Sequence, residues 1–225
     1  KESINLDAWM SSSTHTQHIY NRYGEQADAC ITEGAAALFD GYRRMQGSSA
    51  EIASILNLPV ILLVNARMAG YSVAPLLYGY KHFYSGVHIA GVIFNQVSSP
   101  AHYAHLREAC SDTGLDCLGY LPVMEGFKLS SKHNAISLAN RRIIDEQANL
   151  IASQIEKSID INRMLNRCNR NFPCQYTLPY YSDTEDDMHT FPMHKIKIAI
   201  ARDPAFNFTY QENISRLRKI GEITH

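Results

Sequence analysis

The sequence predicts an α/β fold with an open, mostly parallel sheet and helices on both faces. Short runs rich in Ile, Val and Leu do not alternate with polar residues, a pattern typical of parallel strands covered on both faces. Helix-like segments follow these runs, and alternating strands and helices favour a parallel sheet with right-handed crossovers. The expected strands are Ala29–Thr32, Val60–Val64, Ile89–Phe94, Cys117–Leu121 and Ile196–Ala201.

Three expected helices lie between or after these runs. Ser48 and Glu51 have the spacing of a capping box, which predicts a helix start within GSSAEIASILNLPV. Residues 101–110 form an amphipathic helix that Gly114 ends. A longer helix over residues 139–157 is indicated by apolar residues at helical spacing, namely Ile144, Ala148, Ile151 and Ile155.

The chain divides into three expected segments. Residues 1–165 hold the alternating strands and helices of the main domain. Residues 166–194 contain three prolines and the acidic run SDTEDD without an apolar period, so they are expected to form a linker. Residues 195–225 start again as a strand, a loop and a helix. This partial βα unit is either an edge addition to the first sheet or the truncated start of a second domain.

Composition excludes several classes of function. A chain of 225 residues can bury a substantial core, and its net charge of −1 gives no general affinity for nucleic acid or anionic membranes. The longest apolar run, Pro59–Val64, is too short to span a bilayer. The five cysteines include no C-x-x-C pair, so we expect free thiols in a reducing cytoplasm.

Two acids stand directly before glycines in the stretch ITEGAAALFDG, at Glu33 and Asp40. Glu33 follows the first expected strand, and the carboxyl ends of strands are where open α/β sheets bind ligands. The alternative is that Glu33 accepts backbone hydrogen bonds while Asp40 begins a turn. The spacing alone favours this second interpretation.

The motifs of this chain resemble those of the cobyrinic acid a,c-diamide synthase family, glutamine-dependent corrinoid amidoligases related to dethiobiotin synthetase. The family pattern E-G-V-M-G-L-F-D-G corresponds to residues 33–41, with Ala35–Ala37 in place of V-M-G. Further similar segments occur in family order: NLDAWM (5–10), GSSAEIASILNLPVILLVNAR (47–67), HIAGVIFNQV (88–97), GYLP (119–122) and ARDPAFNFTYQEN (201–213).

Other features depart from the family. Asn65 replaces an aspartate and Lys132 an arginine, and neither a G-x-x-x-x-G-K-[ST] loop nor a glutaminase nucleophile elbow is present. The resemblance therefore implies the central part of a longer enzyme with a P-loop NTPase or dethiobiotin-synthetase-like fold. Residues 195–225 would open its glutaminase-like domain.

The resemblance also implies a chemistry. ATP would phosphorylate a substrate carboxylate, and ammonia derived from glutamine would attack the acyl phosphate. The anionic phosphates need Mg²⁺ and oxygen ligands. Glu33 is implied as a catalytic residue and Mg²⁺ ligand, and Asp40 as a second catalytic acid near the metal and the reacting carboxylate.

Further residues are implied to bind nucleotide and substrate. Asn95 follows a strand, and its amide can both donate to and accept from an adenine edge. Leu121 and Pro122 would form an apolar wall beside the base. For Asn95 the alternative is an ordinary turn cap. The substrate-side residues are Asp7, Lys132 and His133, and for His133 a surface loop is an equal alternative.

Two other functions remain open at the level of sequence. One is the nickel-sirohydrochlorin a,c-diamide synthase, whose substrate is a different macrocycle. The other is a non-catalytic α/β domain that binds a nucleotide or a partner protein. The expected partners are the corrinoid, ATP and ammonia, with no nucleic acid or membrane, and a homodimer remains an open arrangement.

Overall fold

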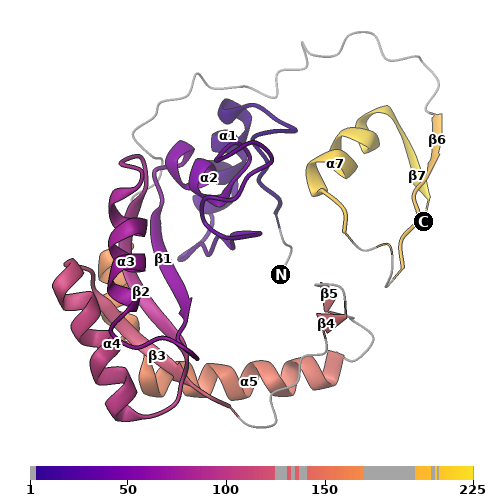
Figure 1. The fold of residues 1–225 in the computed structure, drawn as a ribbon. Helices are drawn as coiled ribbons and strands as arrows, with labels where there is room; N and C mark the ends of the chain where they lie inside the picture. The colour runs from indigo at the N-terminus through magenta and orange to yellow at the C-terminus, as the bar shows by residue number, and fades with distance from the viewer. Residues whose placement is uncertain are drawn as a thin grey trace.

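The structure is a computed structural model that describes residues 4–124, 131–132, 135–136, 141–169, 196–203, 206 and 208–224. Figure 1 shows the arrangement of its elements. The helices are α1 (Ser13–Gly24), α2 (Ser49–Ile55), α3 (Val73–His82), α4 (Pro100–Thr113), α5 (Arg141–Ser158), α6 (Ile161–Arg167) and α7 (Gln211–Ile220). The strands are β1 (Pro59–Asn65), β2 (His88–Val97), β3 (Cys117–Pro122), β4 (Ser131–Lys132), β5 (Ala135–Ile136), β6 (Ile196–Ala199) and β7 (Gly221–Thr224).

The main sheet has the order β1-β2-β3, and both strand pairs are parallel. The central strand β2 is buried on both faces. Val92 and Phe94 pack in a cluster with residues of α3 and α4, whereas Ile93 packs with Leu118 and Ile159 in a second cluster that includes residues of α5 and α6. The predicted α/β class, with helices on both faces of a parallel sheet, is confirmed (Figure 1).

The helix ends follow the local sequence signals. At the start of α2 the Glu51 amide donates to Ser48 Oγ at 3.2 Å, and the Gly47 amide donates to the Glu51 carboxylate at 2.6 Å. The predicted capping pair is therefore formed, with the glutamate reaching one residue further back than in the usual box. At the end of α4, Gly114 has φ 63°, the left-handed conformation that glycine adopts most readily.

The expected strand Ala29–Thr32 is wrong. These residues are exposed and pair with no strand in the part of the chain that the structure describes, and Ile31 is 96% exposed. A strand needs a neighbour to satisfy its backbone and an apolar surface to cover its side chains. Among the described residues the main sheet contains only β1, β2 and β3, so the apolar run has no strand to join.

The carboxyl-terminal unit is longer than the sequence predicts. β6 and β7 pair in parallel around α7, which makes a complete βαβ unit with its own two-stranded sheet. Within the described ranges this unit is not an edge addition to the main sheet. The expected boundary at residue 165 lies inside α6, and residues 170–194 of the expected linker lie outside the described residues.

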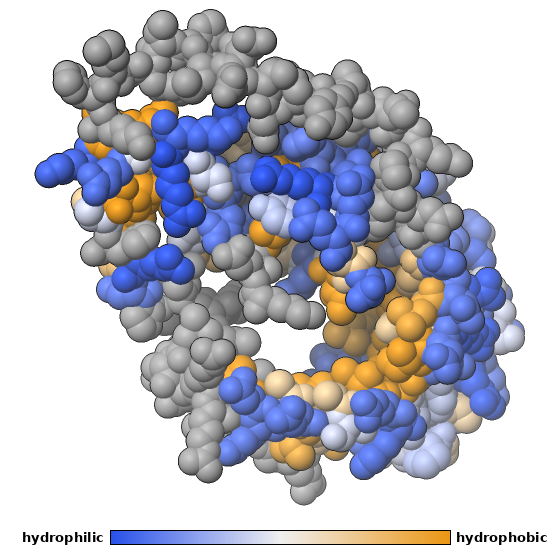
Figure 2. All heavy atoms as spheres, turned by 180° about the vertical axis from the view of Figure 1, so that it is seen from behind, coloured by the Kyte–Doolittle hydropathy of each residue, from blue (hydrophilic) through white to orange (hydrophobic). Residues whose placement is uncertain are grey.

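Strand β1 lies at one edge of the main sheet. Leu63 of the edge strand β1 is 64% exposed. Seen from behind, apolar residues gather on the inner wall where the sheet and α5 face the central opening (Figure 2). In the part of the chain that the structure describes, no helix has the length and apolar character needed to cross a membrane.

Candidate functional site

The carboxyl ends of the parallel strands bring the predicted nucleotide-binding residues together. The Cα of Asn95 in β2 pairs with that of Asn65 in β1, and Val97 pairs with Pro122 in β3. Asn95, Leu121 and Pro122 therefore lie along one edge of the sheet. This is the edge at which open parallel sheets bind ligands.

Asn95 stabilises a local turn through its side-chain and backbone oxygens. Its Oδ1 accepts a hydrogen bond from the Gln96 amide at 2.9 Å, and its carbonyl oxygen accepts one from the Ala66 amide at 2.8 Å. The turn role predicted as the alternative is therefore present. Among the described residues this turn uses only oxygen atoms of Asn95, so its Nδ2 group can donate to a ligand.

The residue after Asn95 has an unusual backbone. Gln96 has φ 61°, and the pairing register between β2 and β3 shifts between Phe94 and Val97. A non-glycine residue in the left-handed region costs on the order of 1–2 kcal/mol, and such outliers gather at functional sites. Gln96 was not predicted from the sequence, because nothing in its local pattern signals a positive φ.

Asn65, which replaces an aspartate of the family, caps a turn. Its Oδ1 accepts a hydrogen bond from the Arg67 amide at 3.0 Å, which begins the turn toward α3. Leu121 packs against the cluster on the second face of the sheet, and the Val123 amide donates to the Val97 carbonyl at 3.1 Å beyond Pro122. The apolar wall next to Asn95 is therefore held to β2 by backbone pairing.

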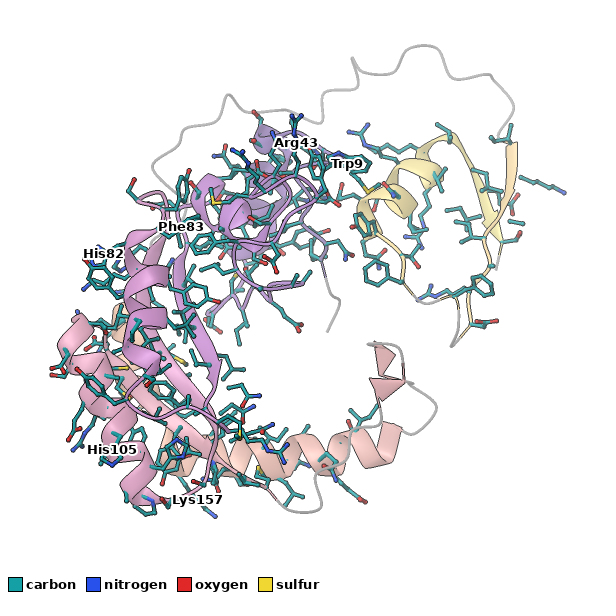
Figure 3. All side chains as sticks on the ribbon, viewed as in Figure 1. Trp9, Arg43, His82, Phe83, His105 and Lys157 are labelled. Atoms are coloured by element: carbon teal, nitrogen blue, oxygen red, sulfur yellow. The ribbon has the colours of Figure 1, made fainter. Side chains whose placement is uncertain are left out.

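The loop that carries Asp40 is anchored by its neighbours. The Phe39 ring lies 5.0 Å from the Phe83 ring and 5.9 Å from the Tyr80 ring, measured between centroids, and Figure 3 labels Phe83 at this end of α3. The Gly41 amide donates to the Arg44 carbonyl at 2.8 Å. A Cβ atom on Gly41 would lie 2.7 Å from that same oxygen, so this position requires glycine.

Glu33 and Asp40 both adjoin the first turn of α2. Directly after Glu33, a Cβ atom on Gly34 would lie 2.6 Å from Ser49 Oγ. Close to Asp40, the Leu38 carbonyl accepts a hydrogen bond from the Ala50 amide at 2.8 Å. Both acids are exposed. The Glu33–Gly34 and Asp40–Gly41 pairs therefore both lie near the amino end of α2.

The loop that carries Asp40 packs near the carboxyl end of α3. Helix α3 runs from the carboxyl end of β1 back to the amino end of β2, and Phe83 is its last cap residue. The Asp40 loop packs on Phe83 and therefore lies where β2 begins. The prediction that Glu33 stands at the carboxyl end of a strand is wrong, because residues 29–32 do not join the sheet. The catalytic roles of both acids stay predictions.

Asp7 is engaged within the chain. Its Oδ1 accepts from the amides of Trp9 and Met10, both at 2.9 Å, and its Oδ2 accepts from the Tyr210 hydroxyl at 3.0 Å. Burial, and then this hydrogen bond to Asp7, raise the pKa of Tyr210. Asp7 thus ties the amino-terminal segment to the residue before α7, a contact that the sequence did not reveal.

The other substrate-side predictions remain open. Trp9 is 68% exposed and its ring meets Tyr42 edge-on at 6.0 Å, on the side of the amino-terminal segment where Figure 3 also labels Arg43. Lys132 belongs to β4 by its backbone, and His133 lies outside the described residues. The substrate-binding roles of Asp7, Lys132 and His133 stay predictions.

The fit to Mg²⁺ rests on donor chemistry. Exposed carboxylates at Glu33 and Asp40 supply the hard oxygen donors that Mg²⁺ prefers, and this ion takes one or two protein carboxylates alongside phosphate oxygens. Among the described residues no three His, Cys, Asp or Glu side chains gather closely enough to hold a metal ion without such phosphates.

Comparisons with known proteins agree with the motifs. Residues 3–130 match the family model described as AAA domain. Cobyrinate a,c-diamide synthases from Saccharolobus solfataricus and Gloeobacter violaceus are 32% and 35% identical, over 98% and 97% of this chain and 49% and 47% of their own lengths. The Salmonella typhimurium enzyme of the same name is 32% identical over 97% of this chain and 47% of its own. The chain thus spans about half the length of the curated relatives it matches. No solved structure matches it.

Proposed function

Because this chain belongs to the AAA domain family and is related over almost its whole length to cobyrinate a,c-diamide synthases, we propose that it is part of an ATP- and glutamine-dependent ligase. The reaction is amidation of the a and c side-chain carboxylates of cobyrinic acid, in the cytoplasm, during cobalamin biosynthesis. The observation that supports this function best is the match to relatives of that name across 97% or more of the chain.

The reaction couples an uphill amidation to ATP. A substrate carboxylate oxygen attacks the γ-phosphorus of ATP, and ADP leaves. Ammonia from glutamine then attacks the carbonyl carbon of the acyl phosphate, and inorganic phosphate leaves with the original carboxylate oxygen. Mg²⁺ would neutralise charge on the phosphates. The chain has to orient ATP and hold acids near the transferred phosphoryl group.

The carboxyl edge of β2 and β3 suits the adenine base. Asn95 Nδ2 can donate to a ring nitrogen while Oδ1 remains in its turn. Leu121 and Pro122 can pack against one side of the base. The family resemblance assigns Glu33 to Mg²⁺ and Asp40 to phosphoryl transfer, and both residues adjoin the first turn of α2.

Asn95→Asp should raise the Kd for ATP by roughly 10-fold or more, the effect of losing one base hydrogen bond worth about 1–3 kcal/mol. The aspartate keeps an oxygen to cap the Gln96 amide, replaces the Nδ2 donor with an acceptor and adds a negative charge, which Asn65→Asp adds as well. The measurement is a calorimetric ATP titration, with Asn65→Asp as the control at the neighbouring strand end. Wild-type affinity in Asn95→Asp, with an unchanged far-ultraviolet circular dichroism spectrum, would reduce Asn95 to a turn cap.

The overall function is tested in a protein of the relatives' full length that contains residues 1–225. We expect cobyrinic acid, ATP and glutamine to yield a product in which two carboxylates have become carboxamides, detected by mass spectrometry. Nickel-sirohydrochlorin is supplied as the competing substrate, and exclusive turnover of it would support the second ligase. ATP binding without amidation of either macrocycle would favour the non-catalytic domain.

A further inference from the structure

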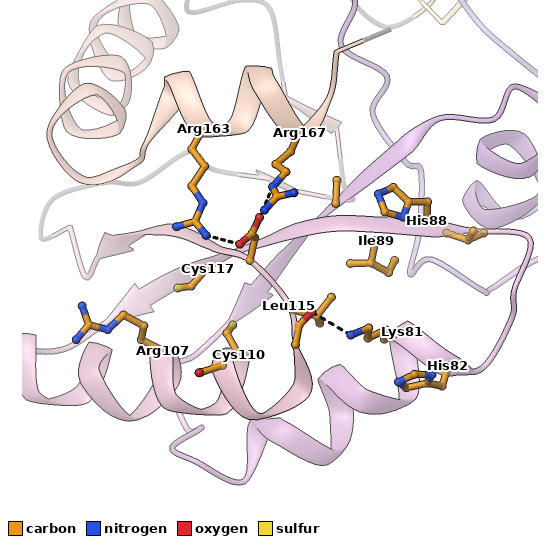
Figure 4. Close-up of a pocket in the computed structure, with 15 residues that line it drawn as sticks. Lys81, His82, His88, Ile89, Arg107, Cys110, Leu115, Cys117, Arg163 and Arg167 are labelled. Carbon is orange, nitrogen blue, oxygen red and sulfur yellow. Dashed lines mark hydrogen bonds and ion pairs between the residues drawn. The ribbon is translucent and has the colours of Figure 1, made fainter.

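A second site lies at the opposite edge of the main sheet from Asn95. A cavity of about 710 Å³ opens where β2 and β3 begin, with α4 on one side and α6 on the other (Figure 4). Two cysteines line it, Cys110 near the end of α4 and Cys117 at the start of β3. Neither belongs to any motif that the proposed function uses.

The turn between α4 and β3 places the two thiols together. The Leu115 amide donates to the Cys110 carbonyl at 2.9 Å, so the chain folds back at Gly114 and returns along the helix. Cys110 is only 1% exposed, and Cys117 packs against the same cluster. Tyr103 belongs to the same helix as Cys110, and its hydroxyl lies 3.3 Å from Cys117 Sγ. Figure 4 shows both sulfur atoms in the space between α4 and β3.

The charges around the cavity are mainly positive. Asp116 forms ion pairs with Arg163 and Arg167 of α6, and Lys81 donates to the carbonyl oxygens of residues at the end of α4 at 2.8 and 2.9 Å. Cys110, Tyr103 and Arg107 act on Cys117 directly. The other titratable or charged groups that line the cavity are Asp116, Lys81, His82, His88, Arg163 and Arg167.

These surroundings shift the pKa values of the two thiols in opposite directions. A hydrogen bond from Cys110 lowers the pKa of Cys117 to about 6; burial opposes this, while the Tyr103 hydroxyl, the Gly119 amide and Arg107 add to it. The same hydrogen bond, together with burial, raises the pKa of Cys110. These shifts favour the thiolate form at Cys117 and the thiol form at Cys110. Only the thiolate is an effective nucleophile.

We propose that Cys110 and Cys117 are a redox-active pair, in which Cys117 reacts with a peroxide and Cys110 closes a reversible disulfide. The Cys117 sulfur attacks one peroxide oxygen, the O–O bond breaks, and the leaving hydroxide takes up a proton to become water. The Cys110 sulfur then attacks the resulting Cys117 sulfenic acid. The S–O bond breaks and hydroxide leaves with the Cys110 proton as a second water.

The electrons and atoms balance in this sequence. The two thiols lose two electrons and two hydrogens, and hydrogen peroxide gains both to give two waters. A dithiol reductant reverses the change by thiol–disulfide exchange. The disulfide ties the last turn of α4 to the first residue of β3. The open cavity lets small oxidants and reductants reach Cys117, which is not fully buried.

The test uses hydrogen peroxide on the full chain, followed by alkylation, trypsin and mass spectrometry. Trypsin releases both cysteines in one peptide, residues 108–128. After peroxide treatment we expect this peptide to carry no alkyl group and to be two hydrogens lighter than its unalkylated dithiol form. After dithiothreitol it should again take up two alkyl groups. The matched control is Cys30→Ser, which removes an exposed thiol and should leave this change intact. A peptide 108–128 that keeps two alkylatable thiols while Cys30 oxidises would overturn the proposal.

Two variants separate the roles of the thiols. In Cys110→Ala the Cys117 sulfenic acid has no resolving partner, so dimedone should trap it. Loss of the hydrogen bond should also move the pH midpoint of Cys117 alkylation by iodoacetamide upward from about 6 toward the ordinary thiol value of roughly 8.5. The rate rises with pH because the thiolate is the reactive form. If this variant does not fold, the pH midpoint of Cys117 alkylation in the wild type is a sufficient test. A wild-type midpoint near roughly 8.5 contradicts the proposal.

Discussion

Asp40→Asn and Glu33→Gln should each lower kcat for cobyrinate amidation by about 100-fold or more, in a protein of the relatives' length that contains this chain. Each change keeps the size of the side chain and its hydrogen bonding but removes a negative charge. An electrostatic group that acts in the transition state is worth on the order of 10²–10³ in rate. The measurement is initial-rate kinetics at saturating ATP and glutamine, with melting temperatures recorded for each variant.

The matched control is Asp28→Asn, which removes an exposed carboxylate from the same amino-terminal segment. It should leave kcat unchanged. This prediction rests on the family resemblance, since the Asp40 loop packs where β2 begins and not beside Asn95. If activity fell only in proportion to lost stability, the two acids would belong to the fold around α2, and the catalytic acids would have to be sought elsewhere.

Gly119→Ala should lower the free energy of unfolding by about 3 kcal/mol or more. Gly119 has φ 140°, a backbone conformation that other residues rarely adopt. Its missing side chain lets the end of α5 cross β3, where the Asp160 amide donates to the Leu118 carbonyl at 2.8 Å. A Cβ atom would clash with the Ser158 carbonyl oxygen and lie 2.7 Å from Ile159 Cα. The measurement is urea unfolding followed by circular dichroism.

Gly79→Ala, in the helix α3 that packs on the same sheet, should have the opposite effect on stability. Gly79 lies within α3, and a Cβ atom there meets nothing within 4 Å. Alanine in a helix interior is favoured over glycine by roughly 0.5–1 kcal/mol, so this variant should be slightly more stable than the wild type. Equal stability of Gly119→Ala and wild type would show that α5 does not dock on β3 as described.

Much of the fold could be predicted because its signals are local. The apolar runs at residues 60–64, 89–94 and 117–121 became β1, β2 and β3, since each run is rich in β-branched or leucine residues and is bounded by turn signals. The capping pair at Ser48 and the left-handed Gly114 likewise depend on a few neighbouring residues. The motif resemblance to cobyrinic acid a,c-diamide synthases is confirmed by relatives of that name.

The sequence by itself determined the parallel α/β sheet and the placement of Asn95, Leu121 and Pro122 at one edge, because parallel strands bring their carboxyl ends together. The tertiary structure decided the features that depend on distant partners. Residues 29–32 have strand-forming side chains but no strand to pair with, whereas β7 forms because β6 lies beside it. Cys110 and Cys117 share a cavity because the turn at Gly114 folds β3 back along α4. Pairing and burial are properties of the assembled chain, and a local pattern does not contain them.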